Sequence, residues 1–234
     1  MSQSPPVYTY YMPVPGLWPE DTQLKLIDLW AESWRKRGWE PIVLGESHAR
    51  RHPRFKEFKQ KFWELPTEYG HDYEGACLMR YVAVAAMGGG MLTDYDVMNY
   101  SVTPERVEKL QAIYDSPQFF LFCNRPPRDV FAGAFFGCPE LYEGVSQIFY
   151  SWEIDKRDFV QSSTYTGYHC SDLSMLMQIF DGRRTRPDWL QLAPGCVLYP
   201  EEGWQTAPMV HYGYAMKTTG HWPKYEGIPK LRPI

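Results

Sequence analysis

Two aspartates one residue apart, Asp94 and Asp96, follow an apolar segment and three glycines in the stretch MGGGMLTDYDVMNY, residues 87–100. If this stretch is a strand, both carboxylates lie on one face, about 6.5 Å apart. Two like charges aimed at one place repel each other unless a cation lies near them. Hard divalent cations take oxygen ligands, and Mg²⁺ is commonly held by one or two carboxylates and by substrate phosphates. The pair predicts a metal that holds a diphosphate; the alternative is an exposed strand end.

Composition limits the classes of protein to which this chain can belong. Its 234 residues suit one domain, and 44% apolar with 22% charged residues is enough to bury a sizeable core. The 24 basic and 28 acidic residues give a net charge of −4, which offers no electrostatic basis for binding a nucleic-acid backbone. We therefore expect no nucleic-acid partner.

The sequence also bears on location. No apolar run reaches the ~18–20 residues of a membrane span, and residues 1–6 lack the apolar core of a signal peptide. The five cysteines are odd in number and no two are three positions apart, so they indicate neither a disulfide framework nor a thiolate zinc site. We expect a cytoplasmic protein without a membrane span.

The elements that must position the aspartates alternate along the chain. β-Prone runs predict strands at residues 7–11, 40–44, 91–97, 118–123, 131–136, 196–199 and 209–212. Helical periodicity predicts helices at residues 22–37, 55–62, 73–87, 104–113, 141–152 and 172–180. Strands alternating with helices indicate an α/β fold with a mostly parallel central sheet flanked by helices. We find no repeat or clear linker and predict a single compact domain over residues 1–234.

The aspartate pair and the residues before it resemble the GT-A glycosyltransferases that carry a sugar-nucleotide D-x-D motif. An arginine on the preceding helix (Arg80), a Gly-Gly turn (Gly89-Gly90) and a strand ending in D-x-D follow one another in the order of that family. The most similar members are outer-chain mannosyltransferases and glucosylating toxins. The resemblance is strong over residues 73–100, weaker over residues 7–44, and patchy after residue 100.

Two positions depart from the family pattern. Arg80 is one residue further from the glycine pair than in most members, so either Gly88 is an insertion or the third glycine forms a bulge at the strand entrance. Cys77 occupies a position where the family often has an aspartate that contacts the donor sugar. The resemblance nevertheless implies a GT-A-like fold in which residues 1–100 bind the donor and residues 101–234 form the acceptor side.

The resemblance implies a donor-binding set. Arg80 and Asp94 would contact the nucleotide sugar, Arg80 through a charge-assisted bond, although a salt bridge on the helix surface is the alternative. The end of the first predicted strand, where α/β folds place ligands, would hold the nucleotide through Thr9, Tyr10 and Tyr11.

Two residues near the carboxyl end fit the same scheme. The family often uses a late histidine as third metal ligand beside the aspartates, and its glycogenin-like branch has a diphosphate-binding lysine six positions later. His211 and Lys217 match that spacing, although Gly213 lies two positions after His211 and the branch has its glycine three positions after the histidine. An imidazole ligand favours Mn²⁺ over Mg²⁺. The alternative for His211 is a structural role, and for residues 211–225 the alternatives are a lid over the ligand and a tail packed on the domain.

Two further segments resemble acceptor-side and donor-side features. Asp172 opens a predicted helix, as does the aspartate that faces the acceptor hydroxyl in the family, so the resemblance implies a catalytic role; an N-cap is the alternative. Residues 131–136, FAGAFF, resemble the segment under the donor sugar, and a plain buried strand is the alternative.

Together these features predict a metal-dependent glycosyltransferase. It would move a sugar from a nucleotide diphosphate sugar to a hydroxyl of a carbohydrate, glycan or other acceptor. The resemblance implies retention of configuration, because the family members that the chain resembles retain it. One alternative is a non-catalytic sugar- or nucleotide-binding module of the same fold. A second is a metal-dependent phosphohydrolase, which usually requires more metal ligands than Asp94, Asp96 and His211 supply.

Overall fold

The computed structural model describes residues 4–14, 20–124, 130–198 and 203–212. The helices are α1 (Glu20–Arg35), α2 (Glu46–Ala49), α3 (Phe55–Glu64), α4 (His71–Ala86), α5 (Pro104–Gln111), α6 (Pro139–Tyr150), the 3₁₀ turn η1 (Lys156–Asp158) and α7 (Asp172–Phe180). The strands are β1 (Pro6–Tyr10), β2 (Glu40–Leu44), β3 (Gly90–Thr93), β4 (Val97–Asn99), β5 (Phe119–Cys123), β6 (Ala134–Gly137), β7 (Phe159–Gln161), β8 (Thr166–Tyr168), β9 (Leu190–Pro194), β10 (Cys196–Leu198) and β11 (Met209–His211).

A six-stranded sheet in the order β2-β1-β3-β6-β5-β9 forms the centre of the molecule. Strand β1 is parallel to both β2 and β3, and β5 is parallel to β9. Only β6 runs against its neighbours β3 and β5 within this sheet. The predicted α/β class with a mostly parallel central sheet is therefore confirmed.

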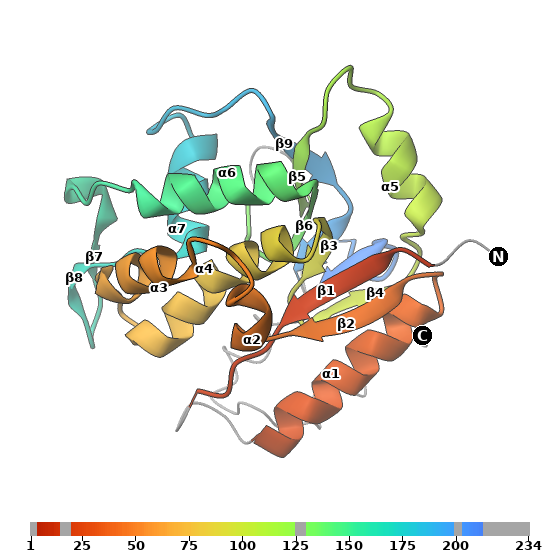
Figure 1. The fold of residues 1–234 in the computed structure, drawn as a ribbon, viewed down its shortest axis with the longest axis horizontal. Coiled ribbons are helices and arrows are strands. Elements are labelled where there is room, and N and C mark those ends of the chain that lie inside the picture. Colours follow the sequence, from red (N-terminus) through yellow and green to blue (C-terminus); the bar gives the residue numbers. More distant parts are fainter. Residues whose placement is uncertain (1–3, 15–19, 125–129, 199–202, 213–234) are drawn as a thin grey trace.

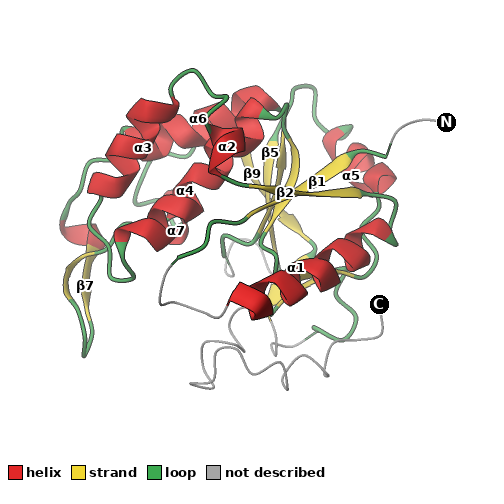
Figure 2. Ribbon diagram, turned by 60° about the horizontal axis from the view of Figure 1, so that its bottom comes forward, coloured by secondary structure: helices red, strands yellow, loops and turns green. Residues whose placement is uncertain are grey.

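Helices cover both faces of the sheet, as Figures 1 and 2 show. On β1, Tyr8 packs into the core formed with α3, α4 and α6, whereas its neighbour Val7 packs into the core formed with α1. On β5, Phe119 and Phe120 divide between the same two cores. This alternation follows from the period of two along a strand, and near-continuous apolar runs are expected where both faces are buried.

A smaller sheet, β10-β11-β4, lies on the α1 side and carries the chain out of the central sheet. Two tryptophans of α1 join the sheets, because the Trp30 Nε1–H donates to Thr93 Oγ1 on β3 at 2.8 Å and the Trp34 Nε1–H donates to the Val97 carbonyl oxygen on β4 at 3.1 Å. Both indole rings are fully buried with their N–H groups satisfied. Helix α1 thus fixes the short segment between β3 and β4.

The predicted strand over residues 91–97 is wrong in its second half. Strand β3 ends at Thr93, and β4 starts at Val97 in a different sheet. The Val97 N–H donates to the Asp94 carbonyl oxygen at 3.0 Å, which closes a four-residue turn. The aspartates therefore do not share a strand face, and the geometry that brings them together is that of a turn.

The three glycines form the entrance to β3. Gly88, Gly89 and Gly90 have φ angles of +98°, +76° and +124°, a region in which residues with a Cβ are strained. A Cβ on Gly89 would also lie 2.7 Å from the Gly137 carbonyl oxygen and from the Pro139 nitrogen. The glycines let the chain reverse from α4 into β3 while it lies close to the end of β6.

Replacing Gly89 with alanine should therefore cost more stability than replacing Gly88, beside which a Cβ would meet no atom within 4 Å. We expect Gly88→Ala to destabilise by about 1 kcal/mol through backbone strain. Gly89→Ala should exceed that by a further ~1–3 kcal/mol because backbone atoms cannot move away from the new methyl group. Urea unfolding of the two variants measures the difference, and equal losses would show that close approach at Gly89 is unimportant.

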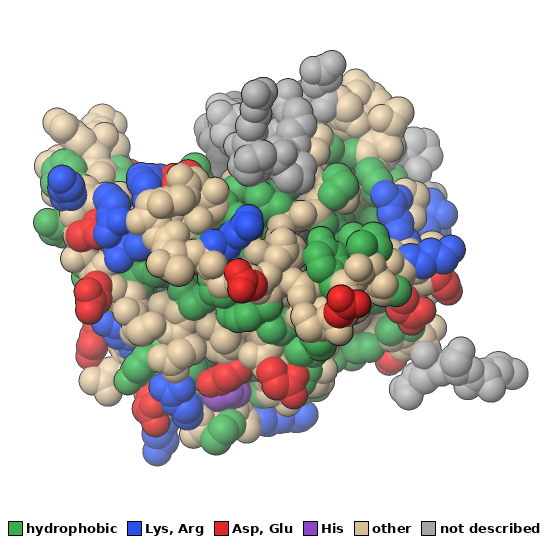
Figure 3. All heavy atoms as spheres, turned by 90° about the horizontal axis from the view of Figure 1, so that it is seen from above, with side chains coloured by type: hydrophobic (Ala, Val, Ile, Leu, Met, Phe, Trp, Pro, Cys, Tyr) green, Lys and Arg blue, Asp and Glu red, His purple; other side chains and the backbone are tan. Residues whose placement is uncertain are grey.

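Two β features lie outside the predicted elements. Strand β9 forms one edge of the central sheet by pairing with β5. Strands β7 and β8 form an antiparallel hairpin that projects from the α7 end of the molecule (Figure 1). On the face in Figure 3, acidic and basic side chains are interspersed. None of the helices in the described ranges has the length and apolarity of a membrane span.

Candidate active site

The turn between β3 and β4 holds Asp94 and Asp96 from both sides. The Asp94 N–H donates to the Gly133 carbonyl oxygen at 2.9 Å, which ties the turn to the segment before β6. The Tyr212 N–H donates to the Asp96 carbonyl oxygen at 3.0 Å, which ties it to the end of β11. With both backbones fixed, the two carboxylates lie at a defined place beside the carboxyl end of β3.

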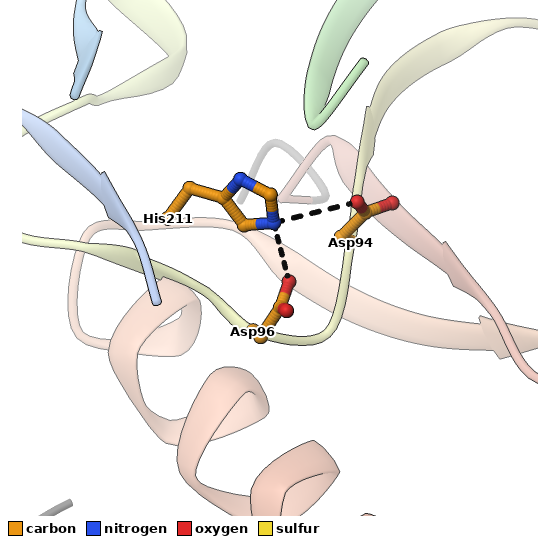
Figure 4. Close-up of side chains that lie close together, drawn as sticks. All are labelled: Asp94, Asp96 and His211. Atoms are coloured by element: carbon orange, nitrogen blue, oxygen red, sulfur yellow. Dashed lines mark ion pairs between the residues drawn. The ribbon is translucent and has the colours of Figure 1, made fainter. Parts of the chain in front are cut away.

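Strand β11 brings His211 to these carboxylates. It runs antiparallel to β4 with His211 opposite Val97, directly after the turn. As Figure 4 shows, His211 Nε2 lies 3.1 Å from Asp96 Oδ1 and 3.7 Å from Asp94 Oδ2. The imidazole ring stacks on Phe131, with centroids 5.4 Å apart and planes 15° apart. The ring is therefore held flat with one nitrogen toward both aspartates.

The donor set of these three side chains fits a divalent cation. One ligand atom from each of Asp94, Asp96 and His211 lies within 4.8 Å of the other two. The two separations that involve His211, 3.1 and 3.7 Å, are below the roughly 4.2 Å between opposite ligands of an ion with ~2.1 Å bonds. Carboxylate oxygens suit Mg²⁺ and Mn²⁺, and the imidazole nitrogen shifts the preference toward Mn²⁺.

Arg80 ties the turn to α7 at the base of the site. Its Nη1 donates to Asp94 Oδ1, and its Nη2 donates to Asp172 Oδ2 and, at 2.6 Å, to the Ala132 carbonyl oxygen. Asp94 thus gives one oxygen to Arg80 and keeps the other toward His211. The alternative predicted from the sequence was a salt bridge of Arg80 on the helix surface. Arg80 does form ion pairs, but its side chain is only 7% exposed, so these pairs lie inside the protein.

Asp172 is the first residue of α7 and not its N-cap. Ser171 caps the helix by accepting from the Ser174 N–H at 3.1 Å. The buried Asp172 carboxylate accepts from Arg80, from the Tyr81 hydroxyl at 3.1 Å and from the Leu173 N–H at 2.7 Å. A carboxylate offers about four lone-pair sites, so about one remains for a further donor.

The electrostatics of this cluster depend on burial and on neighbouring charge. Burial raises the pKa of Asp94 to about 6; the Arg80 guanidinium opposes the rise and the Asp96 carboxylate adds to it. Burial alone would lower the pKa of Arg80, but the carboxylates of Asp172 and Asp94 outweigh it, and the guanidinium keeps its charge. A cation beside Asp94 and Asp96 would favour their ionised forms in the same way.

A cavity of about 430 Å³ opens over this cluster, and Arg80, Asp94, Asp96, Asp172 and His211 all line it. This size suits a small-molecule site. From residues 131–136, Phe131 and Ala132 reach the cavity, while the strand itself starts only at Ala134.

The predicted nucleotide-binding residues of the first strand divide into two groups. Tyr10 and Tyr11 line the cavity, and the Tyr11 ring packs edge-on against Tyr95 at 6.2 Å. Thr9 is fully buried and is not among the residues that line the cavity. The Tyr95 hydroxyl in turn donates to Gln23 of α1 at 3.2 Å, which fixes this aromatic pair beside Asp94 and Asp96.

Some sequence predictions fall elsewhere. Lys217 and residues 213–225 of the predicted lid lie outside the described residues. Cys77 lines the cavity between Tyr73 and Arg80. Burial raises the pKa of its thiol well above the usual value, and the negative charge of the nearby Asp172 adds a smaller rise. Cys77 therefore stays protonated and cannot replace the two oxygens of an aspartate.

The sequence analysis missed a group of cavity residues that lie around the start of α4 and the start of α7. His169, which lacks a motif around it, lines the cavity with Tyr69, Tyr73, Leu173 and Met177. The bond from the Cys170 N–H to the Pro66 carbonyl oxygen, 2.7 Å long, brings the loop before α4 against the start of α7. No local pattern signals such a contact between segments about a hundred residues apart.

Comparison with known proteins gives the fold a context. A family model described as "Domain of unknown function (DUF8765)" matches residues 1–109. No curated protein matches the chain. Among solved structures, the crystal structure of mouse xyloside xylosyltransferase 1 in its apo form is similar, with a TM-score of 0.52 and 9% sequence identity, over 89% of this chain and 97% of that one.

A second similar structure is that of a glycosyltransferase involved in the glycosylation of the major capsid of PBCV-1. Its TM-score is 0.44 at 12% identity, over 88% of this chain and 91% of that one. Identities this low bear on the fold alone, and the likeness in fold rests on the xylosyltransferase structure. The chain has a glycosyltransferase-like α/β fold, with its candidate site at the carboxyl end of the central sheet.

Proposed function

We propose that this chain is a metal-dependent glycosyltransferase that moves a sugar from a nucleotide diphosphate sugar to an acceptor hydroxyl. One observation carries the proposal: ligand atoms of Asp94, Asp96 and His211 converge in a cavity of small-molecule size. The glycosyltransferase-like fold supports it. In open α/β sheets, ligands bind outside the carboxyl ends of the strands, which is where this cluster lies.

The metal residues and the donor residues have separate tasks. Asp94, Asp96 and His211 would hold the cation, Mn²⁺ in preference to Mg²⁺, and the cation would supply Lewis-acid stabilisation to the leaving diphosphate. Tyr10 and Tyr11 offer flat apolar surface for the nucleotide at the end of β1, with Thr9 behind them.

The cationic residues complete the donor site. Arg80 holds Asp94 in place through Nη1 and lines the cavity, where its charge favours the diphosphate. Lys217 would contact the diphosphate, a role that rests on its six-residue spacing from His211.

Sugar transfer requires one bond to form and one to break. The acceptor oxygen bonds to the anomeric carbon, and the bond from that carbon to the diphosphate oxygen breaks, with the electron pair leaving on the diphosphate. The hydroxyl proton goes to the departing phosphate oxygen. Asp172, with about one lone-pair site remaining, would accept a hydrogen bond from a neighbouring hydroxyl of the acceptor and so orient the reacting oxygen. Retention is preferred because the departing phosphate oxygen takes the hydroxyl proton, which places the acceptor oxygen on the face of the sugar that the diphosphate leaves.

Incubation with Mn²⁺ and a panel of nucleotide sugars tests this function. We expect slow, EDTA-sensitive release of nucleoside diphosphate from one donor, because bound water can replace the acceptor. Tight donor binding without release would indicate a non-catalytic binding module. Orthophosphate release from simple phosphoesters would indicate a phosphohydrolase. Neither binding nor release with any donor would contradict the proposal.

A further inference from the structure

The cavity continues past Arg80 to a wall formed by side chains outside the donor and metal residues. We call it the aromatic wall, and its residues are Tyr69, Tyr73, His169, Leu173 and Met177. Tyr73 and Arg80 are seven residues apart on α4, so they point to the same side of the helix about 10 Å apart along its axis. That distance leaves room for a sugar ring beside the donor site.

The aromatic wall presents apolar surface to the cavity. Tyr69, Met177 and Leu173 are 54%, 44% and 36% exposed, and the last two are one helical turn apart on α7. The Tyr69 ring meets Tyr73 at 6.3 Å and 77°, and meets His169 at 5.4 Å and 87°. Rings held nearly perpendicular to one another present one flat face and one edge, which is a shape for a flat apolar ligand surface.

His169 supplies a polar group with a defined role. Its Nδ1 accepts from the Glu68 N–H at 3.1 Å, so a neutral ring carries its proton on Nε2. Burial lowers the pKa of His169, against the smaller opposite influence of Glu68, which favours the neutral ring. The Nε2–H is therefore the hydrogen-bond donor that this ring has left for a ligand in the cavity.

Two serines beside the wall are engaged in structure. The Ser171 and Ser174 hydroxyls serve the cap of α7, each bonded to the backbone of the other residue. The wall thus combines broad apolar surface with the directed Nε2–H donor of His169, and Asp172 lies on the same stretch of chain as His169 and Leu173. Pockets with mainly apolar surface and few placed polar groups fix the orientation of a ligand.

We propose that the aromatic wall is the acceptor subsite and that its ligand is a pyranoside, whose apolar C–H face lies on Tyr69 and Tyr73 while the His169 Nε2–H donates to a ring hydroxyl. This inference rests on the proposed function, because it is the transfer that makes the ligand an acceptor. A pyranoside fits better than an alkyl or aryl alcohol, since its hydroxyl edge uses the donor on His169 while its C–H face covers the rings.

Saturation-transfer NMR with methyl pyranosides of the gluco, galacto, manno and xylo series tests the subsite. It is done in EDTA without donor, so the result does not depend on the metal site. We expect one series to bind at millimolar strength, Tyr69→Ala to weaken binding about three- to tenfold and Tyr69→Phe to leave it unchanged. Tyr114→Ala, an exposed tyrosine outside the cavity, is the matched control.

His169 is tested with deoxy analogues of the sugar that binds. Loss of the hydroxyl that meets Nε2 should weaken binding to the wild type but not to His169→Phe, which keeps a flat ring and loses the donor. Preferential binding of alkyl or aryl alcohols, or equal binding by Tyr69→Ala, would overturn the subsite. Asp96→Asn should bind pyranosides like the wild type, so failure of the metal site and failure of the subsite are distinguishable.

Discussion

Replacing Arg80 with methionine is expected to lower the free energy of unfolding by about 3–5 kcal/mol, because it leaves buried carboxylates without their partner. Arg80 and Asp172 have side chains only 7% and 6% exposed, and the same guanidinium also binds Asp94. Methionine has a similar length and adds no charge. The decrease in the free energy of unfolding is therefore due mainly to the lost ion pairs and not to a large cavity. Urea unfolding at neutral pH measures it.

Two further variants identify the cause of this decrease in stability. The double variant Arg80→Met with Asp172→Asn should recover part of the stability, because the unpaired charge is removed together with its partner. Arg183→Met is the matched control: Arg183 pairs with Asp181 on the surface, where both side chains are more than 40% exposed, and we expect a change of about 0–1 kcal/mol. An Arg80→Met loss no larger than that of the control would contradict the structural role of Arg80.

Replacing Asp96 with asparagine is expected to reduce metal-dependent release of nucleoside diphosphate at least about a hundredfold, since even partners of a metal ligand are worth 10–100-fold. Asparagine keeps the shape of the side chain and leaves the backbone bond from Tyr212 in place. It removes the negative charge that faces His211 and the cation. Steady-state rates with the active donor over a series of Mn²⁺ concentrations measure the effect.

The controls for Asp96 separate chemistry from folding. Asp115→Asn changes an exposed aspartate that does not line the cavity and should leave the rate unchanged. Unfolding of Asp96→Asn should stay cooperative, with a midpoint near that of the wild type. Full activity of Asp96→Asn at low Mn²⁺ would contradict the proposal that Asp94 and Asp96 hold the metal.

Local patterns were enough to predict the elements around the site. Strand β2 was predicted with its observed bounds, and helix α7 likewise, because β-prone residues and helical periodicity are both local signals. The three glycines correctly marked the reversal before β3, which requires positive φ.

The arrangement of the site was harder to predict because it depends on contacts between distant segments. The sequence around Asp94 and Asp96 is as β-prone as a strand, yet the chain turns there because α1 and β11 hold Val97 in another sheet. Arg80 was expected to reach the donor, and its double pairing with Asp94 and Asp172 joins residues up to 92 positions apart. No periodicity in one chain signals such partners.

His169 and Asp172 illustrate the same limit on the acceptor side. An aspartate near the start of a helix is most simply interpreted as a cap, and only the structure assigns that role to Ser171. His169 has no surrounding motif, and its place in the cavity follows from loop contacts with residues 66–69. Helical periodicity predicts α7 but does not show that Leu173 and Met177 are exposed in the cavity.

Anomalous diffraction from crystals grown with Mn²⁺ and a nucleoside diphosphate tests the central claim most directly. We predict one strong anomalous peak with a carboxylate oxygen of Asp94, one of Asp96 and Nε2 of His211 each about 2.1–2.3 Å away, and with diphosphate oxygens completing the coordination. A nucleoside diphosphate bound with no anomalous peak between these three residues, or a Mn²⁺ bound elsewhere in the cavity, would contradict it.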